Sequence, residues 1–179
     1  MIFKSTEIVG AFLIEPEKIE DARGFFARTF CRREFGMHGV NARIAQCSVS
    51  FNVKSGTLRG MHYQAAPQRE TKLVRCTRGA IFDALLDLRP ESLTFGDWAA
   101  FELTAENHRM LYIPEGVAHG FQTLVDGTEV FLQMSEFYEP ESARGVRWND
   151  PAFGIVWPRP PSVISEQDSS FPLVSRDAH

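Results

Sequence analysis

Short strand-like runs follow one another along the chain at intervals of about ten residues, with turn residues between them. Aromatic and β-branched residues are frequent in these runs, and they favour strands because they pack well on a pleated surface. Glycine-containing turns such as Lys54–Gly56 and Pro114–Gly116 separate neighbouring runs. The runs are Ile8–Leu13, Phe25–Phe30, Ala42–Asn52, Thr57–Gln64, Thr71–Thr77, Ala80–Leu88, Phe95–Leu103, Arg109–Ile113, His119–Leu124 and Thr128–Glu136. This spacing predicts an all-β fold, an antiparallel sandwich or barrel.

Helices are expected to be few and short. Cys31–Gly36 and Ala105–His108 each suit a helical turn or two. Beyond Tyr138 the chain becomes irregular, because prolines recur through the rest of it. We therefore expect an extended C-terminal tail wrapped on the body. A length of 179 residues suits one domain, spanning residues 1–179.

Composition and charge argue against several classes of protein. No apolar run approaches the roughly 18 residues of a membrane-spanning helix, and charges interrupt the N-terminus, so we expect neither a membrane protein nor a signal peptide. The three cysteines, Cys31, Cys47 and Cys76, lack CxxC spacing, which fits a reducing cytoplasm. A net charge of −4 argues against nucleic acid as the main partner, but it is compatible with a small anionic ligand.

Three candidate functional side chains lie in two successive runs: Arg59, His62 and Lys72. Arginine makes planar bidentate contacts with phosphate, and histidine exchanges protons near neutral pH. Lys72 shares its strand face with Val74, so it is either solvated on an exposed face or buried with a partner. Arg59 has the wrong parity to share a face with His62 unless Gly60 introduces a bulge. Because a strand histidine is often structural, spacing alone leaves the role of His62 open.

Polar residues at two other places are candidates for the same site. Gln46, Ser48 and Ser50 share one face of their run, which suits either solvent or the lining of a polar cavity. In the tail, Asp168 either lies in a solvated acidic turn or provides a carboxylate that reaches His62 from a distant segment and orients it. The spacing leaves both alternatives open.

The segment Ile113–Phe121 resembles the second half of the cupin signature, a Pro-x-Gly-x-x-His run that ends in His119. In metal-binding cupins that histidine is a ligand, and the first half of the signature supplies two further histidines and a glutamate. Here the first half consists of His62-Tyr63-Gln64, and no glutamate in matching context follows. Because a first-row metal normally requires three or more ligands in one shell, we expect no catalytic metal.

Taken together, motifs along nearly the whole chain resemble the dTDP-4-dehydrorhamnose 3,5-epimerase family. They keep the family order, and they are Asp21–Phe26, Gln46–Ser50, Gly56–Gln64, Lys72–Arg75, Phe82–Arg89, Ser92–Trp98, Ile113–Phe121, Tyr138–Pro140, Arg147–Pro151, Trp157-Pro158 and Ser165–Asp168. The resemblance implies a cupin-type jelly roll without a metal, built as a homodimer in the cytoplasm. It also implies a nucleotide-diphosphate sugar as substrate and no cofactor.

The resemblance implies a specific chemistry and a set of residues that perform it. The carbons beside the ketone of a nucleotide-linked 4-keto-6-deoxyhexose are inverted through an enolate. His62 is the implied base, Asp168 orients it, and Lys72 stabilises the enolate oxygen. We expect Lys72 to be buried, with its charge offset by Asp168 or by the substrate. The residues implied to contact the substrate are Arg23, Phe26, Arg28, Gln46, Ser48, Arg59, His119, Leu132 and Tyr138.

Some of these contacts have more specific implied roles, and one departs from the family. Arg59 and Arg23 are implied to hold the diphosphate, Arg23 and Phe26 to reach across the dimer, and Tyr138 to stack on the base. The family places an acid tyrosine where this chain has Leu132, and leucine donates no proton. Other departures lie at Arg28, Ser48, Ala143 and Gln167. Three alternatives therefore stay open: epimerisation at one centre only, ketoisomerisation of a different nucleotide sugar, and a binding cupin without catalysis.

Overall fold

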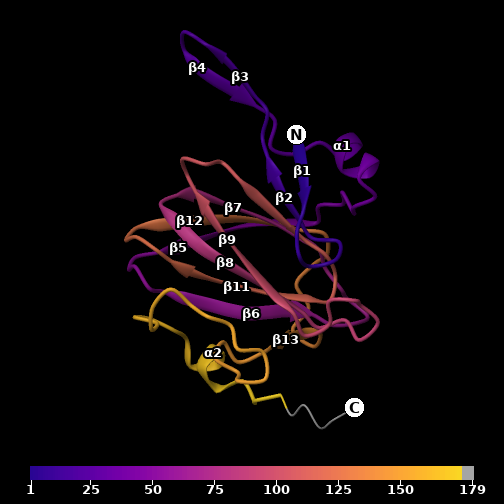
Figure 1. Ribbon diagram of the computed structural model, residues 1–179, viewed down its shortest axis with the longest axis vertical. Helices are drawn as coiled ribbons and strands as arrows, with labels where there is room; N and C mark the ends of the chain where they lie inside the picture. Colours follow the sequence, from indigo (N-terminus) through magenta and orange to yellow (C-terminus); the bar gives the residue numbers. More distant parts are fainter. Residues whose placement is uncertain (175–179) are drawn as a thin grey trace.

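Two antiparallel sheets packed face to face form the body of the molecule in the computed structural model, which describes residues 1–174 (Figure 1). The six-stranded sheet has the order β1 (Ile2–Ser5), β2 (Phe12–Glu15), β10 (Met110–Ile113), β7 (Lys72–Arg78), β12 (Thr128–Met134) and β5 (Gln46–Asn52). The five-stranded sheet has the order β13 (Ala143–Gly145), β6 (Leu58–Gln64), β11 (Val117–Thr123), β8 (Ala80–Asp87) and β9 (Trp98–Thr104). The remaining elements are the hairpin β3 (Lys18–Asp21) and β4 (Gly24–Ala27), and the helices α1 (Arg32–Met37) and α2 (Glu166–Ser170). The predicted all-β jelly-roll sandwich is confirmed.

The core lies between the two sheets because the inward-facing side chains of their strands are apolar. Val74 and Cys76 of β7 pack against Ile81 and Leu85 of β8 in one buried cluster. Burying an aliphatic side chain of this size contributes about 1.5–3 kcal/mol. The same strand parity that places Val74 in this core turns Lys72 toward the space between the sheets, where a cavity opens.

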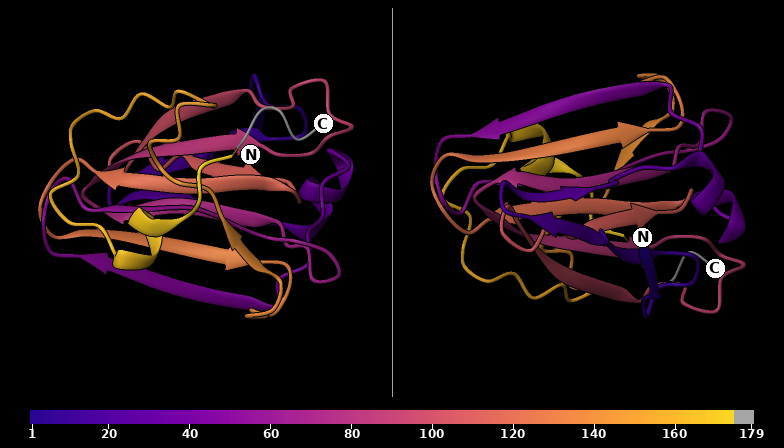
Figure 2. Two further views of the ribbon diagram at one scale, coloured as in Figure 1. Left: turned by 90° about the horizontal axis from the view of Figure 1, so that it is seen from below. Right: turned by 90° about the horizontal axis from the view of Figure 1, so that it is seen from above.

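Both outer faces of the sandwich are partly covered by other segments of the chain. Phe35 of α1 packs with Leu73 and Tyr112 on the outside of the six-stranded sheet. On the opposite side, Trp157 of the C-terminal tail packs with the cluster that contains Met61. Figure 2 shows the tail crossing this side of the molecule. The expected tail wrapped on the body is therefore present, and it brings α2 beside β6.

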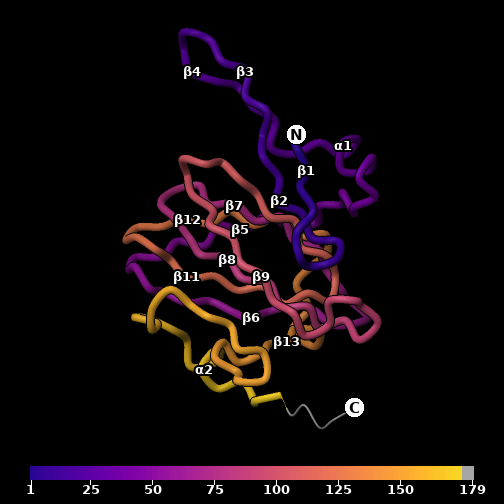
Figure 3. The backbone as a smooth tube through the Cα atoms, in the orientation of Figure 1, coloured from indigo at the N-terminus to yellow at the C-terminus, as the bar shows by residue number. Residues whose placement is uncertain are grey.

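The hairpin β3–β4 stands apart from both sheets (Figures 1 and 3). Its two strands pair only with each other, from Lys18↔Ala27 to Asp21↔Gly24. Ile19 and Phe26 are 71% and 72% exposed. Two large apolar side chains on a projecting ribbon are an unpartnered surface within this chain.

The prediction of secondary structure was right for most of the chain and wrong in specific places. The predicted strand Ile8–Leu13 begins at Phe12, because Ala11 closes a turn onto the carbonyl of Ile8. The predicted Phe25–Phe30 strand ends at Ala27, and Ala105–His108 forms a turn instead of a helix. Four short elements were not predicted: β1, β3, β13 and α2. No helix among residues 1–174 is long and apolar enough to cross a membrane.

Candidate functional site

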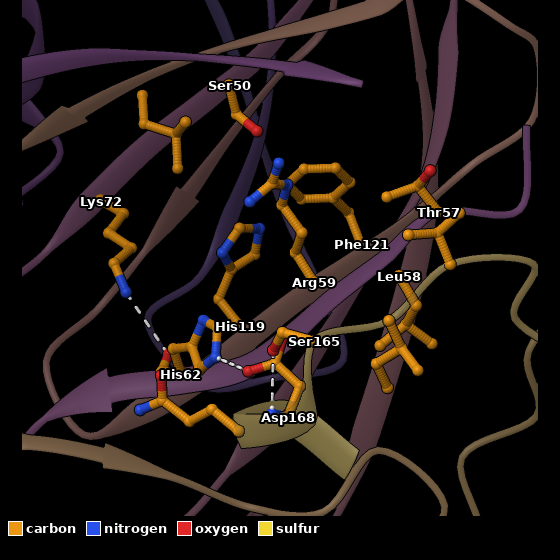
Figure 4. Close-up of a pocket in the computed structure, with 14 residues that line it drawn as sticks. Ser50, Thr57, Leu58, Arg59, His62, Lys72, His119, Phe121, Ser165 and Asp168 are labelled. Atoms are coloured by element: carbon orange, nitrogen blue, oxygen red, sulfur yellow. Dashed lines mark hydrogen bonds and ion pairs between the residues drawn. The ribbon is translucent and has the colours of Figure 1, made fainter. Parts of the chain in front are cut away.

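A cavity of about 560 Å³ opens between the two sheets and under the C-terminal tail (Figure 4). Six of the predicted site residues line it: Arg59 and His62 of β6, Lys72 of β7, His119 of β11, Leu132 of β12 and Asp168 of α2. They come from four strands of both sheets and from the tail. The fold thus gathers residues that lie far apart in the sequence.

His62 and Asp168 form the closest polar pair in the cavity. Nε2 of His62 lies 2.7 Å from Oδ1 of Asp168, although 106 residues separate them. The other carboxylate oxygen accepts a hydrogen bond from the backbone N–H of Gly60. Ser165 caps α2 by accepting from the N–H of Asp168, which fixes the backbone of the acid. The tail carboxylate is therefore not a solvated acidic turn; it is buried against the imidazole.

The charge of Asp168 is stabilised by these contacts. Burial opposes its ionisation, but the hydrogen bond and the charge interaction with His62, together with the Gly60 N–H, hold the pKa of Asp168 below its ordinary value. An ionised carboxylate at this position accepts a hydrogen bond from one ring nitrogen of His62. The other nitrogen is then free to accept a proton from a ligand.

A bulge at Gly60 gives Arg59 and His62 access to the same cavity. His119 pairs with His62 and Phe121 with Arg59, so β6 has one residue more than β11 between the two pairs. Gly60 has φ of +137°, and a Cβ there would overlap Gly120 of the neighbouring strand. Only glycine fits this position. A bulge at Gly60 is the condition under which Arg59 and His62 were expected to share a face, and the structure contains it.

Lys72 is partly buried and paired, but not with the residue that we expected. Its side chain is 12% exposed, and its Nζ lies 3.0 Å from Oε1 of Glu70, itself 10% exposed. The same ammonium donates a hydrogen bond to the carbonyl oxygen of His62. We had expected its charge to be offset by Asp168 or by substrate, whereas Glu70 provides the carboxylate in the structure.

His119 lines the cavity with a second buried carboxylate behind it. Its Nε2 lies 2.9 Å from Oδ1 of Asp83, but the groups are not aligned for a hydrogen bond. Burial raises the pKa of Asp83, and the nearby His119 and Lys72 oppose that rise. Arg59 is also fixed by a buried neighbour, since its Nε donates to Oδ1 of Asn52 at 2.8 Å.

A second cavity of about 300 Å³ adjoins the first, and His62, Lys72 and Gln167 line both. Tyr138, a predicted stacking residue, lines this second cavity and is exposed. Gln46 lies close by, because its side-chain oxygen accepts from the backbone N–H of Tyr138. The two cavities together offer one side rich in groups for proton transfer and another with an exposed ring.

The other predicted substrate contacts do not line either cavity. Ser48 is exposed on β5 and pairs across the strands with Leu132. Arg23 and Phe26 lie on the hairpin β3–β4, which projects away from the body (Figure 1), and the Arg23 side chain pairs only with Asp21 among residues 1–174. Arg28 follows the hairpin and pairs with Glu34 at 3.1 Å.

Two carboxylates at the site were not predicted: Glu70 and Asp83. Ser50, which shares strand parity with Gln46, and Gln167, one of the departures from the family, both line the larger cavity. Glu70 carried a signal in the sequence, because it precedes Lys72 by two residues, the spacing that puts two side chains on one face. Asp83 was recognisable only as a charge within an otherwise apolar strand.

The described part of the chain contains no group of three or more His, Cys, Asp and Glu side chains arranged to hold a metal ion. The histidines of the partial cupin signature, His62 and His119, each face a carboxylate instead. Each imidazole ring therefore has a neighbouring carboxylate that stabilises its charge or orients its N–H group.

Comparison with known proteins places these observations in one family. The family model of dTDP-4-dehydrorhamnose 3,5-epimerase matches residues 5–176. A dTDP-4-dehydrorhamnose 3,5-epimerase of Sinorhizobium fredii is 42% identical over 173 residues, which cover 96% of this chain and 89% of the relative.

Two solved structures show the same likeness in three dimensions. The epimerase of Bacillus anthracis with TDP and PPi bound has a TM-score of 0.92 and 39% identity, covering 97% of this chain and 99% of that one. An epimerase of Legionella pneumophila in complex with dTDP-4-keto-L-rhamnose has a TM-score of 0.89 and 34% identity, with coverage of 96% and 92%.

Proposed function

This chain belongs to the dTDP-4-dehydrorhamnose 3,5-epimerase family and is an isomerase of nucleotide-linked 4-keto-6-deoxyhexoses, and we propose that it inverts C3 and C5 of the dTDP-linked sugar. The pairing of His62 with Asp168 at the mouth of a cavity that also holds Lys72 is the observation that carries the proposal. Relatives named as 3,5-epimerases support inversion of both carbons.

We infer that His62 is the base. The hydrogens on C3 and C5 are acidic because each of these carbons is next to the C4 ketone. The free ring nitrogen of His62 takes one hydrogen as a proton, and the electron pair of the broken C–H bond moves into an enolate. Addition of a proton to the opposite face of that carbon restores the ketone with the centre inverted. Proton transfer of this kind consumes no oxidant or reductant, so no redox cofactor is required.

Lys72 is the proposed stabiliser of the enolate oxygen. Its ammonium is partly buried beside His62, and a positive charge in a poorly solvated site favours an oxyanion that develops there. The charge of Lys72 takes the part that a metal plays in other cupins, so we expect activity to survive prolonged treatment with EDTA. Stoichiometric zinc, iron or nickel bound at His62 and His119 would contradict this assignment.

The nucleotide and diphosphate are assigned to the polar rim of the two cavities. Arg59 is held by Asn52 and faces the larger cavity, where its guanidinium suits a phosphate. Tyr138 offers an exposed ring for stacking of the base, close to Gln46. Ser48 and His119 complete the proposed contacts from the two sheets.

We propose that the working unit is a homodimer in which the hairpin β3–β4 of one chain reaches the cavity of the other. Exposed apolar side chains on the hairpin, Ile19 and Phe26, support this assembly, as do Val49 and Phe51 on the outer face of β5. Arg23 and, beyond the hairpin, Arg28 would then add positive charge to the partner's site. The free cysteines suit a cytoplasmic protein of one domain.

Solvent exchange tests the chemistry directly. The protein is incubated in D2O with a dTDP-linked 4-keto-6-deoxyglucose, and NMR follows deuterium at C3 and C5 together with the product stereochemistry. Deuterium at both carbons with both inverted supports the proposal. Exchange or inversion at one carbon would make the protein a single-centre epimerase, exchange without inversion would show a base without an effective acid, and no exchange would leave a binding protein.

Hybrid dimers test the assembly. Neither His62→Ala nor Arg23→Ala protein should turn over well alone. A mixture of the two, unfolded and refolded together, should regain activity, because one site of the hybrid then has both side chains. An inactive mixture, or a monomer by light scattering, would refute a site shared between chains.

A further inference from the structure

The ion pair between Glu70 and Lys72 lies where the two cavities meet. Glu70 precedes β7, and its side chain lies on the same side of the chain as Lys72, with Oε1 3.0 Å from Nζ. Both side chains line the smaller cavity, and Lys72 lines the larger one as well. At 10% and 12% exposure, neither charge is well solvated, so each depends on the other for stabilisation.

Among residues 1–174, the other carboxylates at the cavity are already engaged. Asp168 accepts from His62 with one oxygen and from Gly60 with the other. Asp83 is fully buried behind His119, which lies 2.9 Å away. Glu70 is therefore the carboxylate that fixes the Lys72 ammonium, together with the carbonyl oxygen of His62.

We propose that Glu70 is a positioning residue for the reaction, one that holds the Lys72 ammonium beside His62 so that it meets the enolate oxygen. The inference rests on the proposed role of Lys72 and adds the group through which that role is set. Without the carboxylate, a lysine on a flexible four-carbon stem turns toward the most negative neighbour, which in the complex is the diphosphate. Its charge is then misplaced when the enolate forms.

The two kinetic constants should respond in different ways. In Glu70→Gln, which keeps the shape and loses the charge, kcat should fall about 10- to 100-fold, less than the roughly 10²- to 10³-fold that losing one donor to an oxyanion costs, because the ammonium is misplaced but still present. KM should stay level or fall, because an anion has been removed beside an anionic substrate. Glu70→Asp keeps the charge and should retain more of kcat than the glutamine variant. A purely structural residue would affect thermal stability without this separation of kcat from KM.

A double-mutant cycle identifies the route of the effect. Glu70→Gln in a Lys72→Met background should cause no further loss of kcat, because the ammonium that Glu70 positions is gone. That double variant leaves no unpaired charge at the site, so it also serves if Glu70→Gln alone is poorly folded. Glu15→Gln is the matched control, since Glu15 lies two strands from β7 in the same sheet, lines neither cavity and pairs with Lys4 and Arg109, so its loss should leave kcat unchanged.

The outcomes separate this inference from the function on which it rests. Wild-type kcat in Glu70→Gln, or an equal loss in the Lys72→Met background, would overturn the role of Glu70 alone while Lys72→Met remains impaired. Wild-type kcat in Lys72→Met would remove Lys72 from the reaction and overturn both. A loss of kcat in Glu70→Gln that disappears in the Lys72→Met background supports the inference.

Discussion

The cavity wall built by the five-stranded sheet differs from the facing wall of the six-stranded sheet in how its polar groups are held. On the first wall, His62, Arg59 and His119 each face a fixed partner: Asp168, Asn52 and Asp83. On the second, Glu70 pairs with the Lys72 ammonium, and Leu132 presents an apolar surface that continues the core. In the proposed reaction, proton abstraction belongs to the first wall, which carries the imidazole and its carboxylate, whereas the second wall supplies a positive charge.

The two walls differ in the groups that they offer for proton transfer: the first has a candidate base, and the second lacks an acid at Leu132. For His62, the proposed base, the contact with Asp168 sets the orientation and the tautomer of the ring. Inversion also requires an acid from the opposite side, and Leu132 offers none there. In the proposed reaction, the returning proton comes from water or from a polar neighbour such as Tyr138, and neither is placed as well as a dedicated phenol.

Removing the proposed base from the first wall should cause the largest loss of activity. In His62→Ala, deuterium exchange at C3 and C5 should fall by about 10⁴-fold or more, because the first wall then has no group that accepts the proton. Nucleotide affinity, measured by calorimetry with dTDP, should stay within a few-fold, since the proposed phosphate contacts lie elsewhere. Wild-type exchange in this variant would show that another group is the base.

Removing the positive charge from the second wall should cause the next largest loss of activity. In Lys72→Met, kcat should fall about 10²- to 10³-fold, the usual cost of losing one donor to an oxyanion, with a smaller change in substrate affinity. Steady-state kinetics separate the two constants. A loss confined to affinity would place Lys72 on the diphosphate instead of the enolate.

Changing the partner of the base should cost less than changing the base. In Asp168→Asn the imidazole remains but loses its fixed orientation and the nearby negative charge, so kcat should fall by roughly 10²-fold. Stopped-flow or NMR rates compared with those of His62→Ala measure the difference. Equal losses in the two variants would mean that Asp168 does more than orient the ring.

Placing an acid on the second wall should raise the rate of inversion, whereas the three preceding changes lower the rate. Leu132→Tyr places a phenol between Ser48 and Val74, its neighbours across the strands, and faces it into the cavity. Because general acid help typically contributes about 10²- to 10⁴-fold, we expect the variant to invert the slower centre at least about tenfold faster. Leu132→Phe is the control for ring volume. If wild-type protein inverts both centres efficiently and the tyrosine has no effect, an acid is already present.

The smallest expected effect is on stability in acid. Because the pKa of Asp168 is lowered in the folded state, its contribution to stability is present above the ordinary carboxyl range and is lost as pH falls through that range and below. Asp168→Asn should therefore reduce stability at pH 7 by about 1 kcal/mol, and the difference from wild type should shrink below about pH 4. Urea unfolding at the two pH values measures it, and a difference independent of pH would contradict the ionised pair.

Sequence reasoning worked best where a property repeats within one strand. Alternation along Thr71–Thr77 put Lys72 on the face of Val74, and the structure has that face inward. It failed for short elements whose stability comes from neighbours. The strand β13 has only three residues, and it exists because it pairs with Gln64, Tyr63 and His62. The helix α2 has only five residues, and the Ser165 cap and packing beside β6 stabilise it.

The amino-acid sequence by itself determined the fold class, the family and the identity of the charged groups, because strand periodicity and motif order are local properties of the chain. Tertiary structure decided which carboxylate serves which cation. Asp168 reaches His62 across 106 residues, and Glu70 takes the place beside Lys72 that we had assigned to Asp168 or the substrate. The physical reason is that a pair forms only where register, the Gly60 bulge and the path of the tail bring two groups within hydrogen-bond distance, and spacing along the chain specifies none of these.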